Sequence, residues 1–155
     1  MKKVLWICNI MLPAIARELG MPYSNREGWL SGIYEKTLQG EVPFEITVCF
    51  PMRKEDLTKI PVTSILNCDA AEAEEKAGTG RSGKNRTNAG FLKIKGSRTP
   101  CYVFEEDLSK PENYDPGLEA RIQGILKDAK PDMIHIFGTE FPHTLAAVRA
   151  FDNPK

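Results

Sequence analysis

The sequence predicts an α/β fold, in which a Rossmann-like, mostly parallel sheet carries helices on both faces. Two observations lead to this class. Short apolar runs, partly β-branched, alternate along the chain with longer segments of helical periodicity. Near the C-terminus, an apolar run, a polar loop and a new helical segment follow one another, which is typical of the turns where open α/β sheets bind ligands. The 155 residues suffice for one domain with its own core.

The first half of the chain predicts strand, loop, helix and strand. Residues 3–8 are expected to form the first strand, followed by a loop that contains Pro13. A helix is expected over 28–39, because Gly40 can end it and apolar residues recur on one side. These apolar residues are Trp29, Ile33 and Leu38. The second strand, 44–50, is expected to stop before Pro51.

The N-terminus also allows another interpretation. Two lysines, an apolar run and Ala14-Ile15-Ala16 together are similar to a secretory signal peptide. Asn9 interrupts the apolar run, and the strand interpretation fits the elements that follow. We therefore favour a buried first strand.

The middle of the chain predicts less regular structure. Residues 62–66 and 91–95 can form short strands, and 70–77 is an acidic, helix-prone stretch. Residues 70–98 as a whole are expected to be a mobile basic loop or insertion. Its cations belong to a solvated face, or alternatively to a surface that contacts anionic lipid. They are Arg81, Lys84, Arg86, Lys93, Lys95 and Arg98.

Part of a phosphate-binding motif is present in this region, but the motif is incomplete. Residues 78–84 fit the pattern G-x-x-x-x-G-K, but Asn85 stands where a Ser or Thr would hold magnesium. The preceding segment is helix-prone, whereas the motif requires a strand. We do not predict a nucleoside triphosphatase.

The last third contains the best-marked helix. After a strand at 101–104, Asp115 can cap a helix that has Pro116 at its first position. Its apolar face comprises Leu118, Ile122, Ile125 and Ala129. A buried strand at 133–137 follows, and then a helix over 144–151 with Leu145, Val148 and Phe151 at helical spacing.

The composition excludes several classes of protein. Lys plus Arg and Asp plus Glu each number 21, so no overall charge points to nucleic acid. The four cysteines are widely spaced and lack the pattern of a zinc site, and they suit a reducing compartment. Cys8 and Cys49 lie in apolar runs and are expected to be buried thiols. No segment is as long as a membrane span.

Three segments carry a resemblance to a known family. They are 3–9 (KVLWICN), 28–33 (GWLSGI) and 131–140 (PDMIHIFGTE). In this order and spacing they resemble the N-terminal domain of family-4 glycosyltransferases of the GT-B fold, especially bacterial enzymes that build surface polysaccharides. The resemblance extends over residues 1–50 and 101–155 and is poor between them.

The resemblance implies a function. In such enzymes, two Rossmann-like domains face each other across a cleft. The N-terminal domain mainly binds the acceptor and the C-terminal domain binds the nucleotide-sugar donor. The sugar is transferred with retention of configuration and without an obligatory metal or other cofactor. Residues 1–155 would then be the N-terminal domain, truncated before its end. The C-terminal donor domain would be missing, and these residues would be inactive alone. The whole enzyme would be cytoplasmic, or peripheral on the inner face of the membrane, with a glycan or lipid-linked acceptor.

The resemblance also nominates site residues. Gly28 matches a glycine whose backbone approaches the donor diphosphate, although Glu27 stands where a second glycine is common. Many members carry a histidine at the position of Phe137, close to the reacting sugar. We expect catalytic roles for Glu140 and His143. Expected donor- or acceptor-binding residues are Asn9, Gly28, His135 and Thr139.

Each nominated residue also has a structural interpretation. His135 can turn inward as a core histidine, Thr139 and Glu140 can cap the next helix, and His143 can be solvated. Gly28 can serve only to pack a helix closely on the sheet. Trp29 is expected in the core in preference to a sugar-stacking surface. The alternative function is a non-catalytic Rossmann-like module that binds a nucleotide or a protein.

Overall fold

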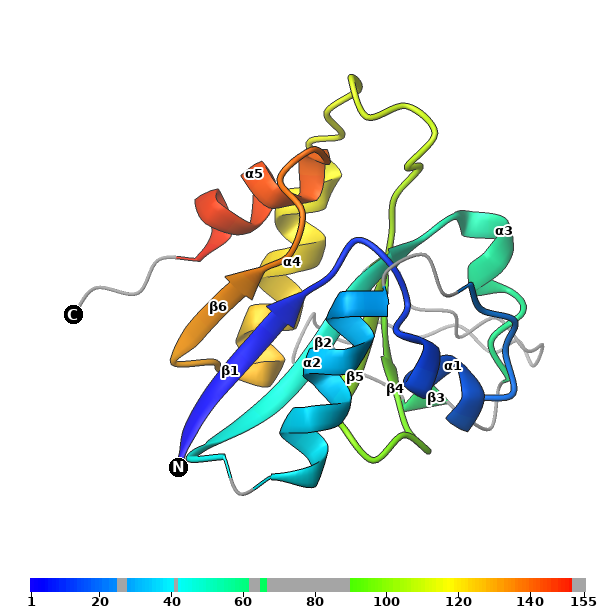
Figure 1. The fold of residues 1–155 in the computed structure, drawn as a ribbon. Coiled ribbons are helices and arrows are strands. Elements are labelled where there is room, and N and C mark those ends of the chain that lie inside the picture. Colours follow the sequence, from blue (N-terminus) through cyan, green and yellow to red (C-terminus); the bar gives the residue numbers. More distant parts are fainter. Residues whose placement is uncertain (25–27, 41, 62–64, 67–89, 152–155) are drawn as a thin grey trace, which may run out of the picture.

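The computed structural model describes residues 1–24, 28–40, 42–61, 65–66 and 90–151. They form a six-stranded sheet with helices on both faces, which confirms the predicted Rossmann-like class (Figure 1). The strands are β1 (Lys2–Ile7), β2 (Phe44–Met52), β3 (Ile65–Leu66), β4 (Phe91–Ile94), β5 (Cys101–Glu105) and β6 (Met133–Ile136). The helices are α1 (Pro13–Glu18), α2 (Gly28–Gln39), α3 (Lys54–Leu57), α4 (Gly117–Ala129) and α5 (Pro142–Ala150).

The sheet is parallel over four strands and antiparallel at one edge. Its order is β3-β4-β5-β2-β1-β6. Strand β1 lies parallel to β2 and β6, and β2 lies parallel to β5, whereas β4 runs antiparallel to β5 and β3. All four parallel strands therefore bring their carboxyl ends to the same edge, where ligands bind in folds of this kind.

Alternation along β1 divides the core into two layers. Val4 and Trp6 pack with α1 and α2 on one face, whereas Leu5 and Ile7 pack with α4 and α5 on the other. Because both faces of the central strands are covered, β1 is a nearly continuous apolar run. This explains why the N-terminal segment also looks like a signal peptide.

Several predicted boundaries agree with the structure and one is wrong. The helix at 28–39 is confirmed, and Asp115 does accept the backbone N–H of Gly117 at 2.8 Å. Pro51, however, lies inside β2, which continues to Met52. Val48 and Met52 form their backbone hydrogen bonds on the β5 side of β2. Pro51 has the opposite orientation, so the position of its missing N–H faces β1. It lies there beyond Ile7, the last β1 residue in register, and therefore breaks no ladder bond.

Two short helices were not predicted. The segment after β1 was expected to be loop, but Pro13 begins α1, and α3 follows β2. Six and four residues are too few to show a helical period in the sequence. The predicted helix at 70–77, the glycine-rich stretch at 78–84 and the start of the strand at 62–66 lie outside the described residues.

The apolar side of two helices was predicted wrongly. In α2 the buried residues are Leu30 and Tyr34, not the expected trio of residues. Trp29, Ile33 and Leu38 are 58%, 45% and 36% exposed. In α5 the buried residues are His143, Ala146 and Ala147, whereas Leu145 and Val148 are exposed. The alanines let α5 pack closely against the sheet, while spacing alone cannot choose between two apolar stripes.

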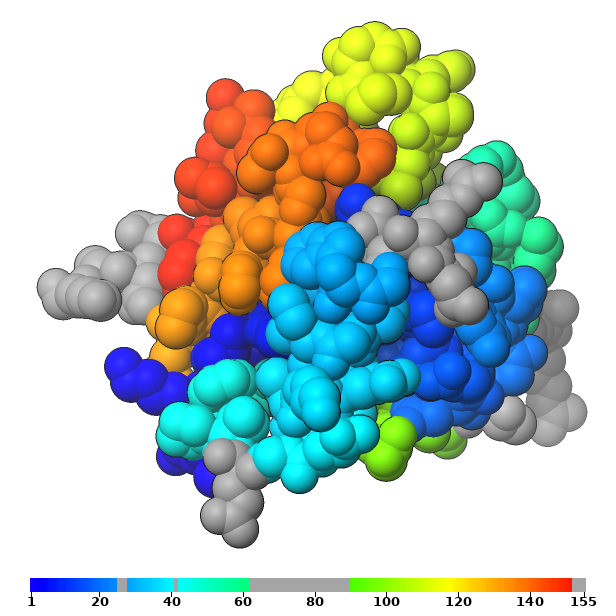
Figure 2. Space-filling view, viewed as in Figure 1, coloured from blue at the N-terminus to red at the C-terminus, as the bar shows by residue number. Residues whose placement is uncertain are grey.

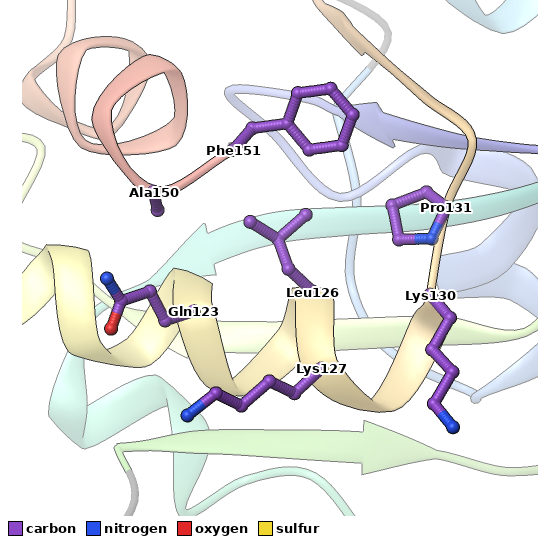
Figure 3. Close-up of a pocket in the computed structure, with 7 residues that line it drawn as sticks. All are labelled: Gln123, Leu126, Lys127, Lys130, Pro131, Ala150 and Phe151. Carbon is purple, nitrogen blue, oxygen red and sulfur yellow. The ribbon is translucent and has the colours of Figure 1, made fainter. Parts of the chain in front are cut away.

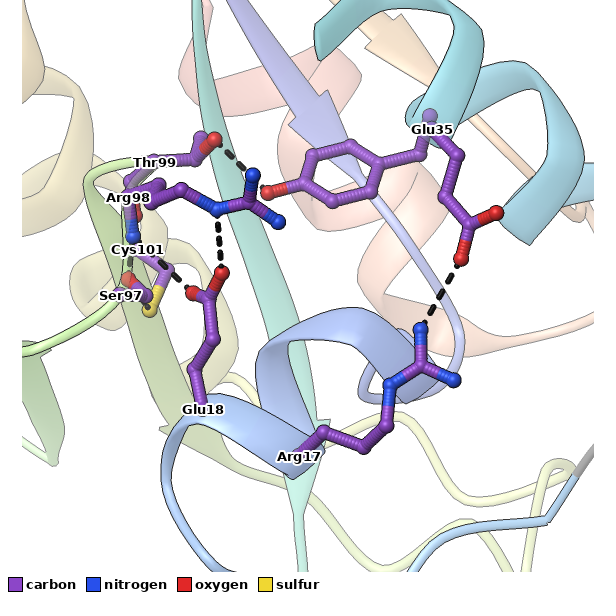
Figure 4. Close-up of polar contacts among 8 residues, drawn as sticks. Arg17, Glu18, Glu35, Ser97, Arg98, Thr99 and Cys101 are labelled. Carbon is purple, nitrogen blue, oxygen red and sulfur yellow. Dashed lines mark hydrogen bonds and ion pairs between the residues drawn. The ribbon is translucent and has the colours of Figure 1, made fainter. Parts of the chain in front are cut away.

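A polar network ties α1 and α2 to the segment before β5 (Figure 4). The Tyr34 hydroxyl donates to Thr99 Oγ1 at 2.7 Å, and both residues are buried. Arg98 pairs with Glu18 through its side chain at 2.8 Å, and its backbone N–H also donates to that carboxylate. Burial raises the pKa of Tyr34, so its hydroxyl remains a donor at neutral pH.

The cysteine and membrane predictions can be compared directly with the structure. Cys8 and Cys49 are buried free thiols, as predicted, and so is Cys101. Burial raises the pKa of the Cys101 thiol to about 11. Among the described helices, none is both long and apolar enough to cross a membrane.

Replacing Tyr34 by Phe should destabilise the fold. The substitution removes one buried hydrogen bond and leaves the Thr99 hydroxyl without its donor, so we expect a loss of about 1–2 kcal/mol in the free energy of unfolding. Urea denaturation of the variant measures it. In the double variant Tyr34→Phe/Thr99→Val, both polar partners are gone, and the cost should fall clearly below the sum of the two single costs. Additive costs would show that the bond contributes no coupling energy.

Candidate functional site

The candidate site lies at the carboxyl ends of β1 and β6. These strands are neighbours, with Ile7 opposite Ile136, so their carboxyl ends lie side by side. The N–H of Phe137 donates to the Ile7 carbonyl at 2.8 Å and extends the pairing by one residue. Asn9 and the loop 138–141 therefore leave the sheet at the same place.

Gly138 brings two nominated side chains together. Its φ is +83°, a conformation that favours glycine. A Cβ at this position would lie 3.1 Å from Glu140 Oε2 and 3.3 Å from Asn9 Nδ2. The carboxylate and the amide therefore converge over the bare glycine backbone. The Gly138 carbonyl accepts a hydrogen bond from the Thr144 hydroxyl at 3.0 Å, which ties the loop to α5.

The start of α5 is capped by a residue from another element. The alternative role of Thr139 and Glu140 as its caps is wrong, because Phe141 is the N-cap residue and makes no side-chain cap hydrogen bond. Glu106, which follows β5, accepts the backbone N–H of His143 at 3.1 Å. Both nominated residues, Thr139 and Glu140, are exposed on the loop instead.

Glu106 and His143 form a buried pair. Glu106 Oε2 lies 2.5 Å from His143 Nδ1, and the two side chains are 5% and 0% exposed. The rings of Phe104 and Phe141 pack against the imidazole. His143 is therefore not solvated, and its Nε2 has no hydrogen-bond partner among the described residues. A proton on Nδ1 suits this geometry, because Nε2 is then an acceptor and no buried N–H lacks an acceptor.

This pair changes what the helix terminus can bind. A helix N-terminus attracts anions through its N–H groups and its dipole. At α5 the carboxylate of Glu106 already occupies that position, and the N–H of Thr144 donates to the Phe141 carbonyl. The N–H groups of His143 and Thr144 at the start of α5 are therefore already paired and are not free to bind a phosphate.

Sequence reasoning missed Glu106, although a signal was present. Tyr102, Phe104 and Glu106 alternate along and just beyond β5, so all three point to the face covered by α4 and α5. A carboxylate that continues an inward-facing alternation at a strand end needs a buried partner. The sequence alone did not show that His143 would supply it.

His135 and Trp29 are both more exposed than expected. The core interpretation of His135 is wrong, since it is exposed on β6 and stacks on Phe137 with ring centroids 4.2 Å apart. The Trp29 ring lies 6.0 Å from the Phe137 ring. Helix α2 lies over β1 and β2, which leaves this face of the edge strand β6 open (Figure 1).

Gly28 stands at the start of α2, near the same end of the sheet. A Cβ there would meet no atom within 4 Å, so close packing on the sheet does not require glycine. The structural interpretation of Gly28 is therefore wrong. Open space beside its backbone is what a close approach by a ligand would need.

Two hollows adjoin the Glu106 side of this edge. One, of about 480 Å³, is bordered by both signs of charge, among them Arg53, Lys54, Glu105 and Lys110. A smaller one, of about 270 Å³, reaches Arg121. Asp107, which borders both, accepts hydrogen bonds from the Ser109 hydroxyl and backbone N–H, and these lower its pKa.

Another hollow lies at the opposite end of the sheet (Figure 3). It has a volume of about 480 Å³ and lies between the C-terminal ends of α4 and α5. Leu126, Pro131 and Phe151 surround its centre, whereas the side chains of Lys127 and Lys130 extend away from it. The lysines therefore do not make it an anion site.

The described part of the chain offers no reactive thiol or metal cluster at this edge. Burial holds the pKa of Cys8, which follows β1, well above its usual range, so the thiol stays protonated. No three His, Cys, Asp or Glu side chains gather there as metal ligands would.

Comparison of the chain with protein-family models, curated proteins and solved structures finds no match.

Removing the Glu106 carboxylate should be costly. Glu106→Ala leaves the imidazole and a helix N–H of His143 buried without their acceptor, so we expect a loss of about 3 kcal/mol in unfolding free energy. Chemical denaturation measures it. Glu105→Ala is the matched control. Glu105 is the half-buried neighbour of Glu106 and makes no such pair, so its loss should cost under about 0.5 kcal/mol. Equal costs would contradict the capping role.

Gly138→Ala should disturb the site as well as the fold. The left-handed backbone conformation costs a non-glycine residue about 1–2 kcal/mol. The new methyl group must also displace the Glu140 carboxylate and the Asn9 amide. We expect lower stability together with a shift of the Asn9 side-chain amide resonances. Gly32→Ala, in an open position of α2, is the control and should be neutral or stabilising. An unmoved Asn9 amide would contradict the convergence.

Proposed function

We propose that this chain is the acceptor-binding half of a retaining glycosyltransferase, which transfers a sugar from a nucleotide-sugar donor during synthesis of surface polysaccharide or another glycan. The resemblance of three sequence segments supports the proposal. The structural observation that carries it is the convergence of Asn9 and Glu140 over Gly138, at the carboxyl ends of β1 and β6.

The chemistry of this site suits a hydroxyl-rich ligand. An amide and a carboxylate can each hydrogen-bond a sugar hydroxyl, and the carboxylate can accept its proton. The same carboxylate repels a phosphate, and the Glu106 side chain already accepts a backbone N–H at the start of α5. We therefore assign the acceptor to this site and Glu140 to direct contact with its reacting hydroxyl.

His143 acts in this proposal as a positioning residue. Its imidazole is fully buried and its Nδ1 is engaged with Glu106, so it does not reach a ligand at the surface. By fixing the start of α5, it fixes the loop that carries Glu140. Thr139 lies on that loop and His135 lies on β6 before it; both are exposed and remain proposed binding residues.

The donor is assigned mainly to another domain. A C-terminal donor domain would hold the nucleotide sugar, and the open backbone at Gly28 would approach its diphosphate. Transfer needs both walls of the cleft to hold donor and acceptor together, so residues 1–155 alone should not turn over. No cofactor or obligatory metal is included in this proposal.

We place the enzyme in the cytoplasm, with peripheral membrane contact as a further option. The basic stretch at 90–98 gives that contact limited support. Lys93 pairs with Asp128 at 2.7 Å and Arg98 with Glu18 at 2.8 Å, so these cations are already partly neutralised. The acceptor is then a glycan or a lipid-linked sugar.

A binding module is the second candidate function. Exposed apolar side chains favour it, among them Met133 on the edge strand β6 and Ile33 on α2, because exposed apolar surface often binds proteins. This module would present the same fold but no saccharide site.

Titration of the chain with acceptor-like saccharides and nucleotide sugars, followed by amide chemical shifts, tests the proposal. We expect saccharides to shift Asn9, Gly138 and Glu140 with dissociation constants on the order of millimolar, because one wall of the cleft encloses little ligand surface. Glu140→Gln should weaken binding, whereas Glu112→Gln, on an exposed loop, should not.

Two results would contradict the proposal. Shifts confined to residues 90–98 would place the site on another surface, and the absence of saccharide shifts would favour the binding module. Sugar transfer by residues 1–155 alone would contradict the division of labour between two domains.

A further inference from the structure

Trp29 is a large apolar side chain that the fold leaves uncovered. It stands in the first turn of α2 and is 58% exposed, whereas Leu30 beside it is fully buried. Water against an indole face is unfavourable, so a ligand that covers Trp29, whose ring lies near Phe137 just beyond the end of β6, gains from displacing that water.

Aromatic neighbours hold one side of Trp29 in place. Phe137 lies 6.0 Å from it between ring centroids, at 55°. Phe137 is itself packed against Trp6 at 4.8 Å and His135 at 4.2 Å. The indole is therefore supported from the sheet while it remains open to solvent. A supported and exposed ring is a preorganised surface for stacking.

The polar groups of the site lie next to this surface. Phe137, which contacts Trp29, directly precedes Gly138, over which Asn9 and Glu140 converge. In Figure 2 the start of α2 (light blue) and the segment from β6 to α5 (orange) meet on one face of the molecule. An apolar platform is thus adjacent to hydrogen-bonding groups.

We infer that Trp29 stacks against the apolar face of a pyranose ring of the acceptor while Asn9 and Glu140 bind hydroxyls at its edge. This inference rests on the proposed function and names the substrate class of the site. A pyranose ring has C–H groups on one face and hydroxyls around its rim, which matches the two kinds of surface.

A nucleobase would also stack on an indole, but the local charge disfavours it. A nucleotide brings phosphates, and the described side chains that converge beside the platform are a carboxylate and an amide. Glu106 already occupies the nearby helix terminus, where a phosphate would otherwise find a free N–H. A neutral sugar is not repelled by the Glu140 carboxylate.

Tryptophan fluorescence and amide shifts test the inference on the whole chain. The chain has two tryptophans, and Trp6 is only 4% exposed, so saccharide-dependent changes in emission should come from Trp29. Trp29→Ala should weaken saccharide binding about tenfold, the effect of losing one aromatic contact of this kind. Trp29→Phe should retain most of the affinity, because a ring remains.

Ile33→Ala is the matched control. Ile33 is 45% exposed on the same helix, one turn farther from the carboxyl end of the sheet, and its loss should leave binding unchanged. Far-ultraviolet circular dichroism checks that each variant is folded.

The outcomes separate this inference from the function on which it rests. If saccharides still shift Asn9 and Glu140 in Trp29→Ala, with the affinity of the parent chain, then Trp29 does not stack on the sugar, and the proposed acceptor site stands. If saccharides shift neither residue in the parent chain, the proposed function itself fails. Tighter, Trp29-dependent binding of a nucleotide, or a dimer that Trp29→Ala dissociates, would overturn the sugar as its occupant.

Discussion

The candidate site depends on one buried contact, the carboxylate of Glu106 against the ring and backbone of His143. It joins the end of β5 to the start of α5, two elements far apart in the sequence. Two donors from one residue satisfy a charge that burial would otherwise make costly. Because the loop 138–141 enters α5 directly, this contact also fixes the residues that the loop presents. The position of the site loop is therefore set by the buried side chain of Glu106.

Most of the fold was predictable because its signals are local. A buried parallel strand is an apolar run, and α4 carries a cap, a proline and one apolar stripe, so periodicity sufficed for both. The helix at 28–39 was placed correctly, yet its buried side was not. Leu30 and Tyr34 share the spacing of Trp29 and Ile33, and only the position of the sheet decides between these pairs. The short α1 and α3 have no period to detect.

The site was predictable only as a location. Strand order brings Asn9 and Glu140 together, and topology alone implied this. The burial of individual side chains could not be predicted from topology. The core alternative for His135 is wrong, because this side chain is exposed, and His143 is fully buried although it follows a polar loop. Both outcomes depend on parts of the chain that are distant in sequence. His135 is exposed because α2 does not cover β6, and His143 is buried because Glu106 binds it. Such pairings carry no sequence period.

The charge distribution at this edge limits the ligand more strictly than its shape does. A helix terminus without a carboxylate would favour a phosphate, but at the start of α5 the Glu106 side chain already accepts a backbone N–H. Glu140 adds a solvent-exposed negative charge on the loop before this helix. A donor diphosphate bound at the same loop would face the exposed carboxylate of Glu140. If the chain works on a nucleotide sugar, the cations that neutralise its phosphates must therefore lie outside the loop 138–141. In the proposed function, the open backbone at Gly28, at the start of α2, is the part of this domain that approaches the phosphates.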